Sequence, residues 1–492
     1  MESTAKKPKK ELQDEEIQLR PLASNGWWLS YLLSAAYLVN RWKYERSATF
    51  EYKFSTVIAF GMALQSMVFH FASQFRSKIF LWILRIVPCA AVSLLLIFFL
   101  YQDVVFSLFS GFTIVITYQA LFSFILRRMP RSFTYGELTI VTQGFMIFLM
   151  NLYFKLLTIA EKATECIKDA NDTVVYSNHF WIQNHRHLSD MEQLTTILQI
   201  GLLGIAFLVG CCYFVKMFQG LAFYILLAAI CIIVVLFPVD DQMAILVLFR
   251  FLTEDLQKLC MMILYIGLIG MTVATVIWQM KRDEQSNTRT RKIFHLLIVL
   301  VFLPGLIYQC AFLFVASGIA LALLIVLETM RIIQLPPVHS ILEHSVQCFI
   351  DEKDSGVVAL TPIYLLVGCS IPLWLHPCPC DLTDSAGFDL LPLMAGVISV
   401  GIGDTAASIV GSKFGKIKWS TNCQKTVEGT VAGILAQALV LPLLIYFGLV
   451  RYSAFLIIKF VISITISSFV ETFTDQVDNL VLPLVTFTLL SV

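Results

Sequence analysis

The sequence has few charged residues: Asp, Glu, Lys and Arg make up 14% of its 492 positions, whereas 58% are hydrophobic. A soluble protein of this length needs more polar side chains to cover its surface, so this composition excludes an ordinary cytosolic protein. The hydrophobic residues form unbroken runs of about 17–25 residues, the length that a helix needs to cross a bilayer. Short alternating segments, which a β-barrel would require, are lacking. The sequence therefore predicts an all-α, polytopic integral membrane protein.

The chain also lacks a strong net charge, a signal peptide and an evident disulfide framework. Its formal charge of +1 excludes an overall field that would attract nucleic acid. Residues 1–26 are charged and contain no apolar core, so we expect a disordered cytoplasmic tail rather than a signal peptide. Most of the 12 cysteines lie in apolar runs and are interpreted as small buried hydrophobic residues. For Cys378 and Cys380, near His376, we favour a plain loop over a zinc site because a fourth ligand is missing.

The apolar runs predict about 14–15 transmembrane helices, the first and last of which are short. The candidate spans are residues 27–40, 54–71, 79–100, 104–126, 138–158, 194–215, 221–238, 259–278, 293–309, 310–328, 357–375, 388–410, 429–449, 453–470 and 480–492.

The basic loops indicate how the spans are oriented in the membrane, because loops rich in Lys and Arg close to spans stay in the cytoplasm. The strongest basic loops are residues 127–131, 281–292 and 411–419. The number of spans between them is even only if the charged stretch 239–258 does not cross, so we predict a lumenal interfacial helix there. The same count puts 159–193, with the glycosylation pattern Asn171-Asp172-Thr173, in the lumen.

No linker or internal repeat divides the chain, yet its polar residues are unevenly distributed. Residues 27–280 form an N-terminal multi-spanning region with few polar groups outside its loops. Residues 281–492 repeatedly place ionisable residues beside helix ends, and the span count puts these clusters on the cytoplasmic side. We therefore predict that the C-terminal region is catalytic.

The first cluster lies at the start of this region, and the second lies in a loop between two of its predicted spans. Arg291, Lys292 and His295 open a predicted span, where they form either a cationic phosphate site or a simple cytoplasmic anchor. An imidazole one turn inside an apolar span needs a polar partner, which makes His295 a candidate site residue. The loop 331–356 contains several carboxylates, Asp354 among them, which suit either a hard cation or a solvated loop.

The third cluster is the most informative, because a lone carboxylate, Asp404, lies near the end of a span among glycines. Such a charge costs about 2.5–3.5 kcal/mol in the hydrocarbon, which favours metal coordination over packing. Glycines permit close backbone approach and can present N–H groups to phosphate. The candidate residues that follow are Gly411, Lys413, Gly415, Lys416, Lys418, Lys425 and Glu428. The glycine and lysine spacing is not that of a Walker A loop. The alternative interpretation, a basic surface loop between spans, explains the lysines but not Asp404 or Glu428.

The fourth cluster is Glu471, Asp475 and Asp478, which would share one face of a continuous helix. Three like charges on one face repel each other unless a nearby cation compensates them. We therefore expect either a metal or the lysine loop to lie opposite these carboxylates.

Together, in this order, the four clusters resemble the CTP-dependent polyprenol kinase family. The matching stretches are Arg291-Lys292 with His295, 349–356 with the span 360–375, GIGDTAASIVGSKFGKIKW at 401–419, KTVEGT at 425–430, and Glu471 with Asp478-Asn479. The resemblance implies an endoplasmic reticulum enzyme that transfers the γ-phosphoryl group of CTP to the hydroxyl of dolichol, producing dolichyl phosphate for protein glycosylation. It also implies a divalent metal, Mg²⁺ or Ca²⁺, and a cytoplasmic nucleotide-binding loop at 411–427.

From the residues and the resemblance we assign expected roles. Asp404 and Glu428 are the predicted metal ligands, Arg291 and Lys292 neutralise developing charge, and Asp478 or Asp354 is the base for the dolichol hydroxyl. The predicted CTP-binding residues are Gly411, Ser412, Lys413, Gly415, Lys416, Lys418, Trp419, Lys425 and Thr426.

Two alternatives remain open at the level of sequence. One is a CTP-dependent kinase or cytidylyltransferase for another lipid, such as diacylglycerol, phytol or phosphatidate. The other is a transporter, which would place its ionisable groups near the bilayer midplane in repeated halves rather than at one side.

Overall fold

The computed structural model describes the chain from residue 19 to 492. The positions that it leaves undescribed within this range are 22, 46–47, 73–77, 170–188, 241, 283–287, 350–355, 378–379, 381–389 and 421–422. Nearly all of the described chain is helical, because apolar helices satisfy their backbone groups internally. Two two-residue strands, β1 (Pro238–Val239) and β2 (Gln242–Met243), form an antiparallel pair. The predicted sequon at 171–173 and Asp354 lie outside the described residues.

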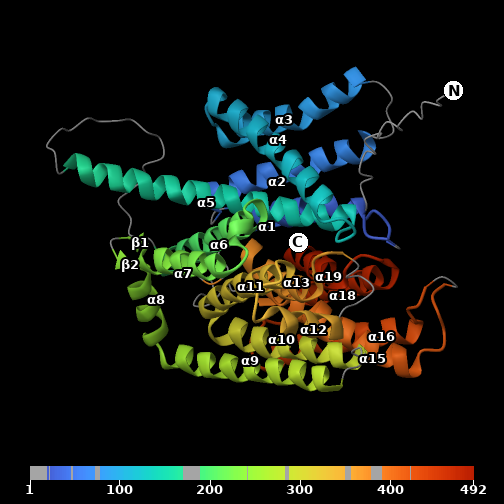
Figure 1. The fold of residues 1–492 in the computed structure, drawn as a ribbon. Helices are drawn as coiled ribbons and strands as arrows, with labels where there is room; N and C mark the ends of the chain where they lie inside the picture. The colour runs from blue at the N-terminus through green and yellow to red at the C-terminus, as the bar shows by residue number, and fades with distance from the viewer. Residues whose placement is uncertain are drawn as a thin grey trace, which may run out of the picture.

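The helices of the N-terminal half form one layer, in blue and teal in Figure 1. They are the 3₁₀ turn Trp27–Tyr31, α1 (Leu32–Lys43), α2 (Phe50–Ala72), α3 (Lys78–Leu100), α4 (Val104–Arg128) and α5 (Tyr135–Asp169). The α2, α3 and α4 helices pack side by side, and α5 packs across α2 and α4. This layer encloses a large apolar core that includes Phe54, Met62, Val92 and Leu138.

The second layer, from green to red in Figure 1, contains the remaining helices. They are α6 (Asp190–Phe214), α7 (Leu221–Leu236), α8 (Ala244–Thr253), α9 (Leu256–Arg282), α10 (Thr288–Tyr308), α11 (Cys310–Ile332), α12 (His339–Phe349), α13 (Thr361–Leu375), α14 (Leu390–Leu393), a π-helix (Val397–Asp404), α15 (Thr405–Phe414), α16 (Val427–Ala438), α17 (Val440–Tyr446), α18 (Ala454–Phe473) and α19 (Asp478–Ser491). A second 3₁₀ turn spans Lys216–Phe218.

The last helix, α19, joins the two layers. It packs against α1 of the N-terminal layer and against α13 and α18 of the C-terminal layer. Residues 479–487 are all buried, which fits a helix that is apolar on every face. The C-terminal end of the chain is therefore part of the core, and the first residue of α19, Asp478, is held at a fixed place in the fold.

The all-α, polytopic prediction is confirmed. Among the described residues, nine helices are long and apolar enough to cross a membrane, and five apolar helices of 10–17 residues accompany them. Apolar side chains on α9, such as Ile263, Ile266 and Ile269, are exposed, as expected of a lipid-facing helix. The sequence predicts that the stretch 239–258 does not cross the membrane. The helix in this stretch, α8, has ten residues and is about 15 Å long, which is too short to cross.

Two predictions need correction. The tail was expected to be disordered to residue 26, but Arg20 is buried and Gly26 packs against Gln476, so the end of this segment is part of the fold. Cys310 lies in an apolar run, where the sequence predicts a small buried residue, and Cys380 lies in what it predicts as a plain loop, but the two form a disulfide. Both sequence errors have one cause: the partners are 70 or more positions away and no local pattern marks them.

Candidate functional site

The ends of several C-terminal helices bring buried charges together around Asp404. The Lys292 Nζ atom, on α10, lies 2.5 Å from Asp404 Oδ2, and His295 Nε2, one turn later, lies 3.3 Å from the same oxygen. Asp404 and His295 are only 5% and 7% exposed. The predicted need of His295 for a polar partner is thus met by Asp404, and Lys292 and Asp404 form a buried ion pair.

Small residues before Asp404 explain how it reaches α10. A Cβ atom on Gly401 would lie 2.5 Å from Val299 Cγ2 on α10, and one on Gly403 would lie 2.5 Å from Gln437 Nε2 on α16. The segment Val397–Asp404 is π-helical, a form that often occurs at functional sites. The glycines therefore let the π-helix pack closely between α10 and α16, which carries the Asp404 carboxylate to the two basic residues.

A second group of charges surrounds Lys425, just before α16. The Nζ atom of Lys425 lies 3.0 Å from Glu471 Oε1 on α18 and 3.8 Å from Asp478 Oδ2 on α19. Burial alone would lower the pKa of Lys425, but Asp478, Glu471 and Asp404 outweigh it and raise the pKa, so the side chain stays charged. The sequence left either a metal or the lysine loop as the partner of the fourth cluster, and Lys425 of this loop contacts two of its carboxylates.

The two groups form one site with an unequal number of charges. Asp404 interacts electrostatically with Lys425 as well as with Lys292, so it connects them. Three carboxylates, Asp404, Glu471 and Asp478, share two ammonium groups and one imidazole. The carboxylates of this group therefore outnumber its ammonium groups by three to two, and carboxylates beside bound phosphate are the usual ligands of Mg²⁺.

The predicted nucleotide loop is closed on itself by backbone pairing. Lys418 and Thr426 form an antiparallel bridge, and the Val427 amide donates to the Ile417 carbonyl at 2.8 Å. The side chains of Ser412, Lys413, Lys416 and Lys418 are exposed on this loop. The loop therefore presents its basic side chains to solvent beside the buried charges.

Several of the predicted nucleotide-binding residues make contacts that build the loop. Thr426 caps α16 by accepting from the Gly429 amide, and the Trp419 Nε1 donates to Thr430 Oγ1 at 3.0 Å. A Cβ on Gly415 would clash with the Gly411 carbonyl oxygen, so this glycine is needed for packing. These three positions shape the loop whether or not they touch a nucleotide.

Glu428 lies apart from the buried charges and has another contact. Its carboxylate accepts from the backbone N–H groups of Lys416 and Ile417 at 3.1–3.2 Å. A closed metal cage is not preformed: within the described part of the chain, no three His, Cys, Asp or Glu side chains gather as metal ligands. The pairing of Asp404 with Glu428 as ligands stays a prediction.

The fourth cluster is arranged differently from the sequence prediction. The α18 helix ends at Phe473 and α19 begins at Asp478, so Glu471, Asp475 and Asp478 do not share one continuous face. The Asp475 carboxylate instead accepts hydrogen bonds from Ser24.

Arg291, which the sequence places in the first cluster, is half-buried beside Lys292. Its backbone carbonyl contacts His295 Nδ1 at 3.3 Å.

A hydroxyl pair that sequence reasoning missed lies next to Lys425. Thr430 Oγ1 and Thr472 Oγ1 are 2.8 Å apart and link α16 to α18. Thr430 ends the KTVEGT stretch and Thr472 follows Glu471, so their place in the two motifs was the available signal.

Comparisons with known proteins identify the family of the chain. The family model described as Dolichol kinase matches residues 109–445. The curated dolichol kinases of Bos taurus and Homo sapiens are each 32% identical to this chain over 375 residues, which is 72% of the chain. The chain belongs to the dolichol kinase family.

The match to dolichol kinases does not extend over their whole length. The chain covers 64% of the bovine and human proteins, and 41% of the Arabidopsis thaliana protein named Dolichol kinase EVAN, to which it is 35% identical over 244 residues. No solved structure matches the chain. The dolichol kinase family therefore rests on sequence relatives, and the geometry above comes from the fold of this chain.

Proposed function

We propose that the protein is a CTP-dependent dolichol kinase of the endoplasmic reticulum membrane. It transfers the γ-phosphoryl group of CTP to the terminal hydroxyl of dolichol and yields dolichyl phosphate. The observation that carries the proposal is the buried, unequal charge cluster around Asp404 and Lys425, in a chain of the dolichol kinase family. Phosphoryl transfer depends mainly on positioning and on stabilising charge, which suits such a cluster.

In this proposal the lysines and the loop bind the nucleotide phosphates. Lys425 is already oriented by Glu471 and Asp478, and Lys292 by Asp404, so little side-chain entropy is lost when phosphates bind. The exposed lysines 413, 416 and 418 attract the nucleotide from solvent. Asp478, whose side chain is 19% exposed, is the base candidate that an incoming hydroxyl reaches.

A divalent cation, Mg²⁺ or Ca²⁺, fits this charge balance. Mg²⁺ in nucleotide enzymes is usually held by one or two carboxylates plus substrate phosphates, so it needs no preformed cage of three protein ligands. Asp404, which interacts electrostatically with Lys425, is the carboxylate of the buried cluster that would hold it. When bound, the cation supplies neutralisation of phosphate charge.

The disulfide supports a cytoplasmic orientation of the site. Cys310 and Cys380 pair next to the last residue of α10, whereas Lys292 lies near its first residue, about 24 Å away along the helix. Disulfides persist in oxidising compartments such as the lumen of the endoplasmic reticulum. A lumenal disulfide puts the opposite end of α10, with the charge cluster, at the cytoplasmic face, where soluble CTP meets a membrane alcohol.

Labelled nucleotides test the proposal. Purified protein in vesicles is given γ-labelled or α-labelled CTP, or γ-labelled ATP, with dolichol, phytol or diacylglycerol. We expect γ-label from CTP in dolichol above all other combinations. Transfer of α-label would identify a cytidylyltransferase, transfer to another alcohol only would identify a different lipid kinase, and no transfer at all would favour a transporter.

A further inference from the structure

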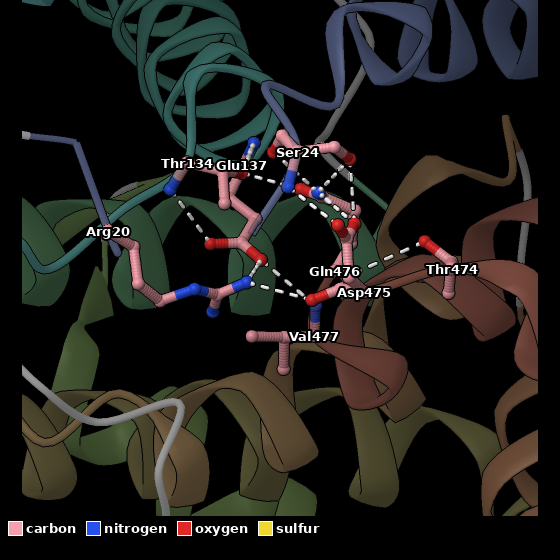
Figure 2. Close-up of polar contacts among 8 residues, drawn as sticks. All are labelled: Arg20, Ser24, Thr134, Glu137, Thr474, Asp475, Gln476 and Val477. Atoms are coloured by element: carbon pink, nitrogen blue, oxygen red, sulfur yellow. Dashed lines mark hydrogen bonds and ion pairs between the residues drawn. The ribbon is translucent and has the colours of Figure 1, made fainter. Parts of the chain in front are cut away.

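A second buried polar cluster lies outside the charge cluster described above, where the N-terminal layer meets the connector between α18 and α19 (Figure 2). Its centre is Glu137, which is fully buried. The Glu137 Oε1 atom accepts from Arg20 Nη2 at 2.8 Å and from the Val477 amide at 2.9 Å, and Oε2 accepts from the Thr134 amide at 3.1 Å. Only the last of these bonds belongs to the helix cap of α5.

The cap alone does not explain this arrangement. Thr134 and Glu137 form a reciprocal pair of side chain to backbone bonds at the start of α5, which an exposed Glu also provides. Burying a carboxylate is costly unless it is paired and hydrogen-bonded. Arg20 supplies the positive charge that compensates the buried Glu137 carboxylate. Because capping α5 does not require this ion pair, we infer that the pair has a second role.

That role is found in the connector, residues 474–477, because its last three residues all contact the N-terminal region. Arg20 Nη2 donates to the Asp475 carbonyl at 3.2 Å, and the Asp475 carboxylate accepts from Ser24. Gln476 Nε2 donates to the Ser24 carbonyl at 2.9 Å, and Val477 donates to Glu137. Figure 2 shows these side chains converging on the connector from both sides.

The connector carries two residues of the charge cluster at its ends. Glu471 lies in the last turn of α18 before it, and Asp478 is the first residue of α19 after it; both contact Lys425. A shift in residues 475–477 therefore moves Asp478 relative to Lys425. Misplacement of a reacting group by about 1 Å can cost about 10²-fold in rate.

We propose that Arg20 and Glu137 are positioning residues that fix the connector and so set Asp478 and Glu471 against Lys425. The inference rests on the proposed kinase function, because the effect is read in phosphoryl transfer. It gives the N-terminal layer a part in catalysis: a buried support for the site built from the C-terminal helices.

Two variants separate this role from simple folding. Glu137→Gln keeps the shape and one acceptor but leaves Arg20 without its charge partner. Val477→Pro removes the amide that donates to Glu137, at a φ of −72° that proline adopts, exchanges one buried apolar side chain for another, and leaves both members of the Arg20–Glu137 pair unchanged. Arg20→Lys, which keeps the charge, should retain more activity than Arg20→Met.

Glu51→Gln is the matched control. Glu51 lies at the start of α2, interacts electrostatically with Lys155, and is half-buried in the same layer. The other end of α2 adjoins Tyr135 through His70, so Glu51 is about 30 Å from the connector. This change also deprives a lysine of a carboxylate partner, but the connector should not move.

The experiment measures kcat and KM for CTP per folded enzyme, with hydrogen exchange of residues 474–480. For Glu137→Gln and Val477→Pro we expect kcat to fall roughly tenfold to hundredfold, KM for CTP to change little, and exchange to accelerate. Glu51→Gln should match the wild type in all three.

Wild-type kcat in both variants would overturn the inference, as would a lower kcat with unchanged exchange in the connector. A wild-type protein that transfers no phosphoryl group from CTP would instead overturn the proposed function, and the exchange data would still test the support of the connector.

Discussion

The molecule contains two groups of buried charge that differ in balance. Around Glu137 one carboxylate meets one guanidinium, and backbone amides from two other segments satisfy the carboxylate oxygens. Around Lys425 three carboxylates share two lysines, and Asp404 is contacted by side chains of α10. In the first group one carboxylate is matched by one guanidinium, whereas in the second group the carboxylates outnumber the lysines by three to two.

This difference indicates which group serves structure and which serves a ligand. A buried ion pair that is matched and hydrogen-bonded can hold a fold together, but an unmatched carboxylate raises the energy of the folded state. Such a cost is typical of sites where binding energy matters more than stability. Substitutions that change one charge at a time test this difference between the two groups.

The largest effect is expected for Asp404→Asn. The change removes the carboxylate that orients both Lys292 and His295, and it removes a candidate cation ligand. We expect kcat per folded enzyme to fall by about 10²–10³-fold, as for removal of a key electrostatic group, together with a lower thermal midpoint because the buried Lys292 loses its partner. Wild-type kcat in the Asp404→Asn enzyme would contradict the role assigned to the unequal group.

The next effect is expected for Lys425→Met, which makes the imbalance worse. Glu471 and Asp478 lose the cation between them, so both stability and phosphate binding should suffer. We expect about 10²-fold lower kcat/KM for CTP and a lower thermal midpoint. Lys425→Arg is the control, because it keeps the charge; equal activity of the Met and Arg variants would show that the charge is not needed.

A smaller effect is expected for Glu428→Gln, which belongs to neither buried group. Loss of charge-assisted bonds to the Lys416 and Ile417 amides should loosen the loop and raise KM for CTP severalfold, without a change in kcat. The concentration of Mg²⁺ that gives half-maximal activity should stay the same. A large rise in that concentration would restore Glu428 as a metal ligand.

The smallest effect on catalysis is expected at the other end of α10, away from Lys292 and Asp404. Cys310→Ser removes the disulfide and should lower the free energy of unfolding by about 2–4 kcal/mol while leaving kcat unchanged. Thermal inactivation with and without reductant checks this. If reductant does not alter the wild-type protein, the two cysteines are not bonded in the membrane.

The sequence predicted those features that depend on local pattern. Long apolar runs were enough for the helices, and a carboxylate such as Asp404 inside one was recognisable because the hydrocarbon penalises it. Its link to Lys292 and His295 is made by α10, which is about 110 residues earlier, and only the ordered resemblance to a kinase family joined these motifs. The end of α18 at Phe473 was not foreseen, because the fourth cluster has a helical spacing that the connector interrupts.

The contacts between the two layers could not be predicted for a physical reason. Arg20 fell within the segment expected to be a disordered tail, and Glu137 was not singled out, because the role of each depends on contact with the other, 117 positions away. The backbone amides that Glu428 contacts were likewise not foreseen, because no sequence pattern distinguishes such partners. Side-chain type predicts which residues need partners, while the fold decides which partners they find.

The most direct test of the difference between the two groups is the binding of Mn²⁺, a paramagnetic substitute for Mg²⁺, to purified protein with and without CTP. We predict that wild-type protein binds Mn²⁺ tightly only with CTP, that Asp404→Asn weakens this binding about tenfold or more, and that Glu137→Gln leaves it nearly unchanged. Equal Mn²⁺ binding by the wild type and Asp404→Asn would contradict the assignment of the unequal charge cluster to the nucleotide and its cation.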